Sequence, residues 1–280
     1  MNEKNIKFER APKTELPKME RINIGESEFE VSAKGGMITG WKHKDKDIIP
    51  ELHQKENSTS LRGGVPICFP FFGPSPIGME SIPQHGWLRN EELSGKMVEN
   101  YNPGDIKIDS DKKGALIEQI KNKTVIQFSK ENEPTAEYPW KLKYTITHIL
   151  TEDGMETVLE IERLNDGQEE DAPINPAFHP YFAIKQDGQT KIDGEEPNFS
   201  PNDYGIDITD DSDIVISTQG GLIKMQTEGF GKVWIWSDNP DKYACIEPVI
   251  QEPEKFNTPE GKFLKQREKI QVSMKLGIIK

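Results

Sequence analysis

The chain has 280 residues, enough for one sizeable hydrophobic core, so we expect one domain over 1–280 with residues 1–19 as a peripheral segment. Its net charge of −13 excludes nucleic acid and anionic membranes as main partners, because both require a basic surface. The sequence holds no apolar run of about 20 residues and starts without a signal-peptide pattern, which predicts a cytoplasmic protein.

Short strand patterns follow one another along the chain, and long helical periodicity is missing. Gly, Pro, Asn and Asp separate the apolar runs, as in proteins with many short strands. This pattern predicts an all-β sandwich or barrel without an internal repeat. The predicted strands are 21–23, 28–32, 124–128, 143–150, 156–163, 214–217, 232–236, 244–247 and 269–276.

Residues 143–150 and 156–163 have the strongest hairpin pattern. Side chains alternate between the two faces of a strand, so Tyr144, Ile146, His148 and Leu150 share one face. The segment TEDG separates the two strands, and its Asp153-Gly154 pair is a strong turn signal. We expect His148, inside this strand, to be structural.

Residues 62–90 form a long segment that cannot be regular structure, because its five prolines fix φ and remove backbone donors. The segment is nevertheless rich in aromatic residues, which favour burial. A loop that packs on a core while carrying charged side chains is how many binding sites are built. The candidate site residues here are Arg62, His85 and Arg89.

Two later segments also place a titratable side chain among apolar neighbours. His179 lies in NPAFHPYF at 175–182, where only a hydrogen-bonded imidazole would be tolerated. Glu247 lies in YACIEPVI at 243–250, and a buried glutamate requires an arginine, a histidine or a ligand as partner. Taken alone, each is a weak signal, and their combination indicates a site.

The remaining polar features are expected to be structural or solvated. His43 and His53 have charged neighbours and are predicted to lie on the surface. The acidic stretches 166–173 and 207–213 lack the Gly and terminal Glu of a calcium loop, which favours solvated loops. Cys68 and Cys245 each have apolar neighbours and are predicted to be buried thiols.

The blocks RGGVPICFPFFG, PQHGWLRN, FHPYF and VWIWSDNP…CIEP together resemble the aldose 1-epimerase (mutarotase) family, most closely its glucose-6-phosphate 1-epimerase branch. The resemblance covers roughly residues 20–276. It implies a galactose mutarotase-like β-supersandwich with the sugar in an open cleft. It also implies roles for residues at matching positions: His179 as general acid, Glu247 as general base, His85 as the histidine that orients the sugar, Arg62 and Arg89 as phosphate ligands, and Asp203 as a substrate-binding acid.

Anomerisation needs a proton taken from the C1 hydroxyl and another delivered to the ring oxygen. One acid and one base suffice, so we expect no cofactor and no metal, and the sequence offers neither a Gly-rich phosphate loop nor a compact metal motif. Near neutral pH we expect Glu247 to be ionised and His179 to be protonated, since a carboxylate nearby raises the pKa of an imidazole. The expected partner is a small-molecule sugar or sugar phosphate, bound by a monomer.

Several alternatives remain open from the sequence. Either arginine could instead pair with a carboxylate such as Glu91 or Glu247. Trp87 could belong to the core or stack on a sugar face. The chain could act on free aldoses, or bind carbohydrate without turnover. His85, His179 and Glu247 also have the composition of a two-histidine, one-carboxylate metal site, but none of these residues are close in sequence. A glycosidase would need a second carboxylate beside Glu247.

Overall fold

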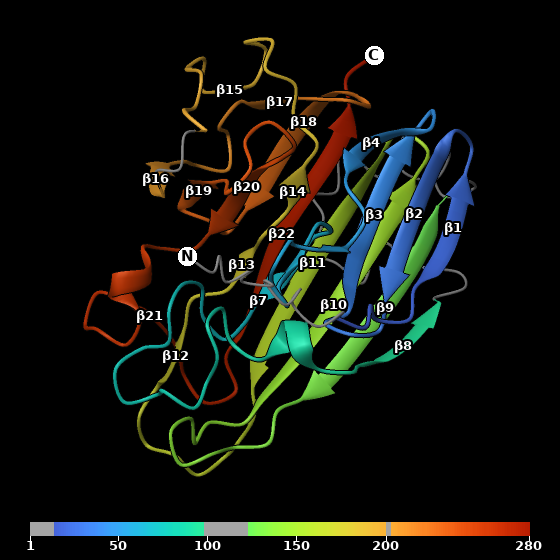
Figure 1. Ribbon diagram of the computed structural model, residues 1–280. Helices are drawn as coiled ribbons and strands as arrows, with labels where there is room; N and C mark the ends of the chain where they lie inside the picture. The colour runs from blue at the N-terminus through green and yellow to red at the C-terminus, as the bar shows by residue number, and fades with distance from the viewer. Residues whose placement is uncertain (1–13, 98–122, 200–202) are drawn as a thin grey trace, which may run out of the picture.

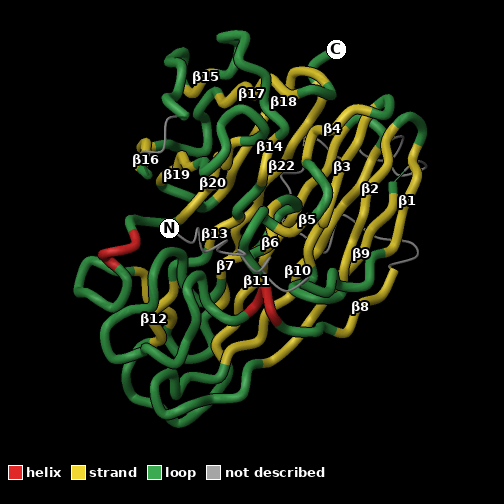
Figure 2. Tube along the Cα trace, viewed as in Figure 1, coloured by secondary structure: helices red, strands yellow, loops and turns green. Residues whose placement is uncertain are grey.

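The computed structural model describes residues 14–97, 123–199 and 203–280, and strands dominate it (Figures 1 and 2). The predicted all-β fold is confirmed. Helix in the described residues is limited to two single-turn 3-10 segments, η1 (Leu88–Asn90) and η5 (Pro253–Lys255). Neither segment approaches the length and apolarity needed to cross a membrane. The predicted peripheral segment lies largely outside the described residues, and residues 14–19 are exposed or half-buried.

An eight-stranded antiparallel sheet forms the largest layer, with the strand order β15-β17-β18-β22-β11-β10-β9-β8. It contains five of the nine predicted strands, namely 124–128, 143–150, 156–163, 214–217 and 269–276. Its strands are β8 (Ser94–Met97), β9 (Thr124–Glu131), β10 (Leu142–Thr151), β11 (Gly154–Arg163), β15 (Lys191–Ile192), β17 (Ile214–Thr218), β18 (Gly221–Glu228) and β22 (Lys269–Ile278).

A four-stranded meander packs over part of this sheet, and Figure 1 shows it in blue across β9 to β11. Its strands are β1 (Glu20–Ile24), β2 (Ser27–Ser32), β3 (Met37–His43) and β4 (Lys46–Ile49). Phe29 and Trp41 of the meander belong to the same hydrophobic cluster as Phe128 and Ile146 of the large sheet. Burial of these inner faces is the main source of stability for the two layers.

The remaining strands form a six-stranded sheet and two short pairs. The six-stranded sheet has the order β16-β19-β20-β13-β7, and β14 also pairs with β20. Its strands are β7 (Ile67–Cys68), β13 (Ala177–Phe178), β14 (Tyr181–Phe182), β16 (Tyr204–Asp207), β19 (Lys232–Trp236) and β20 (Ala244–Val249). The pairs are β5 (His53–Gln54) with β6 (Leu61–Arg62), and β12 (Ala172–Ile174) with β21 (Lys262–Leu264).

The predicted hairpin forms between β10 and β11, with its turn one residue earlier than expected. Thr151 pairs with Gly154, so Glu152 and Asp153 make the two-residue turn and Gly154 opens the second strand. His148 is structural as predicted: its Nε2 lies 2.8 Å from the carbonyl oxygen of Gly36 in the meander. Because a carbonyl can only accept, the neutral ring carries its proton on Nε2.

His43 corrects one surface prediction, because it is buried and its Nδ1 lies 3.1 Å from Ser27 Oγ. Its charged neighbours suggested exposure, but successive side chains of a strand point to opposite faces, so Lys42 can face solvent while His43 faces inward. His53 is exposed as predicted. Cys68 and Cys245 are both buried free thiols, as expected.

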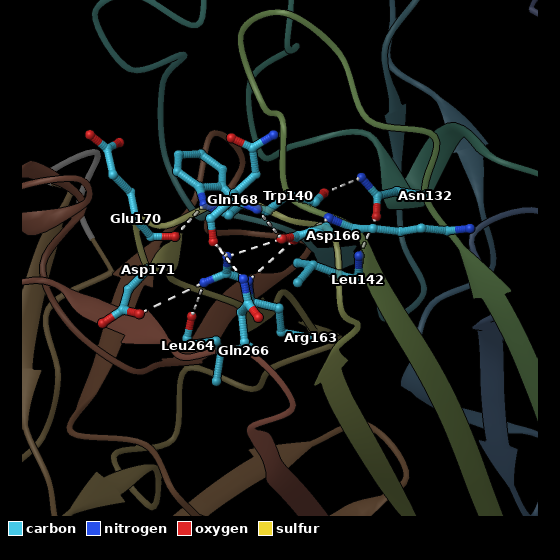
Figure 3. Close-up of polar contacts among 11 residues, drawn as sticks. Asn132, Trp140, Leu142, Arg163, Asp166, Gln168, Glu170, Asp171, Leu264 and Gln266 are labelled. Carbon is cyan, nitrogen blue, oxygen red and sulfur yellow. Dashed lines mark hydrogen bonds and ion pairs between the residues drawn. The ribbon is translucent and has the colours of Figure 1, made fainter.

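Arg163 at the end of β11 is fully buried and corrects a second prediction, that the stretch 166–173 is simply solvated. Asp166 accepts hydrogen bonds from Arg163 Nε and Nη2, both at 3.2 Å. The guanidinium also donates to the carbonyl oxygens of Leu264 and Gln168, as Figure 3 shows. This network ties the loop after β11 to β21.

Candidate functional site

Strand β20 carries Glu247, and the pairing of its neighbours places His179 beside it. Ala177 pairs with Val249 and Tyr181 pairs with Cys245 in an antiparallel arrangement. The same register puts residue 179 opposite residue 247. Side chains directly opposite each other on adjacent strands share one face of a sheet and lie close together. Residues 68 positions apart in sequence therefore meet because of strand register.

The two side chains form a close, buried pair. His179 Nε2 lies 3.4 Å from Glu247 Oε2, and the residues are 6% and 1% exposed. Neither Glu247 Oε2 nor His179 Nδ1 has a hydrogen-bond partner among the described residues. Buried polar atoms are normally hydrogen-bonded, and an exception calls for an explanation such as a catalytic role or a bound ligand. The pair is thus a candidate acid–base couple that is open to a ligand.

Burial decides the resting protonation of this pair. It lowers the pKa of His179 well below its usual value, and His85 and Arg89 lower it further. Burial also raises the pKa of Glu247 well above its usual value, with a contribution from Asp203. Both shifts favour neutral groups, because desolvation outweighs the attraction between the two charges. Both shifts oppose the predicted resting state of an ionised glutamate beside a protonated histidine.

His85 lies against His179, with the ring centroids 5.3 Å apart and the planes nearly perpendicular. The backbone N–H of Gly73 donates to His85 Nδ1 at 3.1 Å. The neutral ring therefore carries its proton on Nε2 and can donate from that atom. Burial, reinforced by Arg89, lowers the pKa of His85 to about 3, so the ring is neutral near pH 7. Its backbone φ of +64° is unusual for a residue other than glycine.

Arg62 forms a two-pronged ion pair with Asp238. Its Nη2 and Nε lie 2.8 and 3.2 Å from Asp238 Oδ2, and Lys55 Nζ lies 2.6 Å from the same oxygen. The carboxylate partner is therefore neither Glu91 nor Glu247, the two that the sequence suggested. The guanidinium carbon also lies 5.3 Å from the ring centre of Trp236, a cation–π distance.

Arg89 has a different environment from Arg62. Its Nη2 donates to the carbonyl oxygen of Gln84 at 2.9 Å. The predicted alternative partner Glu91 instead lies 3.2 Å from Lys130 Nζ and accepts from the hydroxyl of Tyr144. The described residues thus give Arg89 no carboxylate partner, and its guanidinium can serve an anionic ligand.

These side chains line one cleft of about 780 Å³. The structure brings together there six of the predicted site residues: Arg62, His85, Arg89, His179, Asp203 and Glu247. Trp87 does not line the cleft. Its ring makes edge contacts with Phe69 and Tyr138 at centroid distances of 5.9 and 5.2 Å, which places it with the core. The interpretation of Trp87 as a sugar-stacking residue is not supported by this position.

Two aromatic side chains of the cleft, Trp234 and Trp236, come from β19 and were not predicted as site residues. Trp234 pairs with Glu247 and Trp236 pairs with Cys245 across the β19–β20 register. The indole Nε1 of Trp234 donates to Asp203. The signal was present in VWIW, because alternation puts both tryptophans on one face of a strand that neighbours Glu247.

Known structures share this fold. A protein from Synechocystis sp. PCC 6803 aligns with a TM-score of 0.71 and 15% identity over 96% of this chain and 98% of its own. A galactose mutarotase related enzyme from Lactobacillus acidophilus aligns with a TM-score of 0.65 and 16% identity over 94% and 98% of the two chains. The predicted galactose mutarotase-like fold is confirmed.

Sequence comparison then gives the family. The aldose 1-epimerase family model matches residues 20–217, so the chain belongs to the aldose 1-epimerase family. Two curated relatives carry names that propose a glucose-6-phosphate 1-epimerase. The one from Escherichia coli (strain K12) is 33% identical over 20% of this chain and 20% of its own length. The one from Salmonella typhimurium is 24% identical over 58% of this chain and 47% of its own. The chain therefore matches less than half the length of these relatives.

Proposed function

We propose that this chain is a cofactor-independent aldose 1-epimerase that interconverts the α and β anomers of a hexose 6-phosphate. The observation that carries the proposal is the buried pair of His179 and Glu247, 3.4 Å apart, on a face that lines the cleft. Anomerisation needs an acid and a base that reach two oxygens bonded to the same carbon, and a close pair meets that need.

The proton balance of the pair suits the reaction. A neutral imidazole beside a neutral carboxyl contains as many protons as an imidazolium beside a carboxylate, and one transfer between Glu247 and His179 interconverts them. Sugar hydroxyls that donate to the carboxylate would lower the pKa of Glu247 and favour the charged form. Glu247 then takes the proton of the C1 hydroxyl while His179 protonates the ring oxygen. The ring opens, C1 turns about the C1–C2 bond, and closure reverses both transfers.

The 6-phosphate would be held by the arginines. The guanidinium of Arg89 has no carboxylate partner in the described part of the chain, and its planar fork matches phosphate oxygens. Arg62 and Lys55 together carry two positive charges against the single charge of Asp238. In a chain of net charge −13, such local cations are what a dianionic sugar requires.

A second candidate is a mutarotase for free aldoses, and the bidentate pairing of Arg62 with Asp238 favours it. A guanidinium whose fork is already filled by a carboxylate has fewer donors left for phosphate. In that case the acid–base chemistry is unchanged and both arginines have structural roles.

NMR magnetisation exchange between anomers tests the proposal with glucose 6-phosphate, glucose and galactose as separate substrates. Glu247→Gln should slow exchange by about 10²- to 10⁴-fold because the base is lost. Arg89→Ala should slow exchange of the phosphosugar alone by about 10- to 100-fold, through loss of charged hydrogen bonds. Arg267 is an exposed arginine outside the cleft, so Arg267→Ala is the matched control. This variant should leave the exchange rates of all three sugars unchanged.

Each other result has a defined meaning. Faster exchange of free sugars with no effect of Arg89→Ala would replace the phosphosugar proposal by the free-aldose one. Full activity in Glu247→Gln would overturn the acid–base assignment. Absence of exchange with every sugar, together with retained sugar binding, would indicate a carbohydrate-binding protein.

We also propose that the chain is a single-domain, cytoplasmic monomer. The two unpaired buried cysteines support this compartment.

A further inference from the structure

Cys245 lies next to the acid–base pair and has no part in the proposed reaction. Cys245 and Glu247 are two residues apart on β20 and therefore project from the same face of the strand. One ligand atom from each of His179, Cys245 and Glu247 lies within 4.8 Å of the other two, and all three residues are buried. A thiol, an imidazole and a carboxyl thus converge on one point.

These three groups match the chemistry of a borderline-soft divalent cation. Zn²⁺ binds thiolate sulfur at about 2.3 Å, and imidazole nitrogen and carboxylate oxygen at about 2.0–2.2 Å. Tetrahedral bonds of those lengths separate the ligand atoms by about 3.3–3.8 Å, so small side-chain rotations would close the present spacing. Glu247 Oε2, buried and without a hydrogen-bond partner in the described structure, supplies an acceptor that is already free to bind.

The cleft gives such an ion a path to the three ligands and space for a fourth ligand. His179 and Glu247 line the cleft, whereas Cys245 is fully buried and does not. An ion that enters the cleft would meet the histidine and the glutamate first and the thiol next. Three protein ligands leave one position open toward the cleft, where water can bind.

We propose that His179, Cys245 and Glu247 form an inhibitory site for Zn²⁺ or a similar cation, which blocks the sugar by occupying the acid–base pair. Binding requires the thiolate and carboxylate forms, so the protons carried by the thiol and the carboxyl are released to solvent. The inhibitory consequence rests on the proposed function, whereas the binding itself does not.

Cobalt absorption tests the binding directly. The metal-free full chain is titrated with Co²⁺, and thiolate-to-cobalt charge-transfer absorption reports coordination by cysteine. The absorption should appear in the wild type and disappear in both Cys245→Ala and Cys245→Ser. Cys68→Ala is the matched control, because Cys68 is the other fully buried thiol and lies outside the three-residue cluster.

Calorimetry supplies a second readout with Zn²⁺ itself. Titrations in two buffers of different ionisation enthalpy should show release of about one to two protons for each ion bound. The two Cys245 variants should bind Zn²⁺ at least 10- to 100-fold more weakly, since loss of even an outer-shell partner costs that much. Absence of charge transfer in the wild type, or its persistence in both Cys245 variants, would overturn the proposal. Loss of the charge-transfer absorption in Cys68→Ala but not in the Cys245 variants would also overturn it.

The anomer exchange assay then tests inhibition. Zn²⁺ should slow wild-type exchange in competition with the sugar, and it should leave Cys245→Ala active and unaffected. Equal inhibition of wild type and Cys245→Ala would overturn the proposed inhibitory role. If no variant exchanges anomers at all, the proposed function fails, and the cobalt and calorimetric results still decide the binding site.

Discussion

Arg163 is the buried charge whose removal has the clearest structural consequence. Its guanidinium donates two hydrogen bonds to Asp166, whose side chain is 3% exposed, and two more to backbone carbonyls. Burial would raise the pKa of Asp166, but hydrogen bonds from Arg163 and the backbone lower it below its usual value. We predict that Arg163→Leu costs about 3–5 kcal/mol of unfolding free energy, because the buried charge of Asp166 loses its cationic partner.

Urea denaturation measures this cost, and Lys141→Ala provides the control. Lys141 forms an ion pair with Glu131 in which both side chains are more than a third exposed. Exposed pairs contribute at most about 1 kcal/mol. A loss in Arg163→Leu as small as that in Lys141→Ala would contradict the prediction. The double variant Arg163→Leu/Asp166→Leu should recover part of the loss, since no buried charge remains.

At the scale of elements, the loop over 62–90, which unlike the prediction includes the short strand β7 and the 3-10 segment η1, depends on one glycine. Gly86 has a φ of +75°, and a Cβ there would overlap the carbonyl oxygen of Phe69. The backbone of Phe69 is hydrogen-bonded to the same stretch of loop. Its N–H donates to the carbonyl oxygen of His85, and its carbonyl oxygen accepts from the N–H of Trp87. The close approach at Gly86 therefore positions the loop that carries His85 and Arg89.

We predict that Gly86→Ala lowers the unfolding free energy by several kcal/mol or displaces the loop, because it combines backbone strain with a steric overlap. The matched control is Gly78→Ala in the same loop. Gly78 has a φ of +81°, but a Cβ there meets no atom within 4 Å. The control should lose only about 1 kcal/mol, from strain alone. Equal urea midpoints for the two variants would refute the role of close approach at Gly86.

The sequence predicted β10 well because one of its faces is more exposed than the other, but it missed β18, whose buried residues also alternate. In β10, buried Tyr144 and Ile146 alternate with more exposed Lys143 and Thr145, which is the pattern that identifies a strand. Strand β3 was missed because almost every residue in it is buried, so no alternation exists to detect. Strands such as β13 and β14 have two residues each, too short for any periodic signal.

The candidate site was predictable in its chemistry but not in its arrangement. Local context marked His179 and Glu247 only weakly, because a titratable residue in an apolar run needs a partner, and their roles came from the resemblance to the aldose 1-epimerase family. Their meeting depends on strand pairing, which the sequence does not specify. Asp238 was missed as the partner of Arg62, since residues 176 positions apart carry no local sign of contact. The position of Trp87 stayed open in the sequence because an aromatic ring suits a core and a sugar face equally well.

At the scale of the whole molecule, the site exists only when distant parts of the chain have assembled. The cleft draws residues from the loop over 62–90, from β19 and β20, and from the segment that joins β13 to β14. Such contacts are mostly long-range, and their closure entropy must be offset by burial of the sheets. Stability of the whole fold therefore controls the site, and pH acts on that stability through buried histidines.

His148 links the large sheet to the meander and gives a pH dependence that can be measured. Burial lowers its pKa to about 4, although the hydrogen bond to Gly36 opposes the shift. The unfolded chain has the ordinary histidine pKa of about 6.5, so between pH 6.5 and 4 it binds a proton that the folded chain does not. Unfolding free energy contributed by His148 is thus present above pH 6.5 and is lost as pH falls toward 4, by on the order of 3 kcal/mol.

Comparison of unfolding free energies at pH 7 and pH 5 tests this linkage. His148→Gln should be less stable than the wild type at pH 7, because the packing around a fully buried ring is disturbed. It should also lose less stability on acidification, because glutamine does not titrate. His53→Gln, at an exposed position, should keep the wild-type pH dependence. Buried Glu247 acts in the opposite direction above pH 4.5, but it is common to all three proteins and cancels in the comparison. An equal loss of stability in the wild type and His148→Gln would show that the imidazole of His148 does not couple protonation to the docking of the meander.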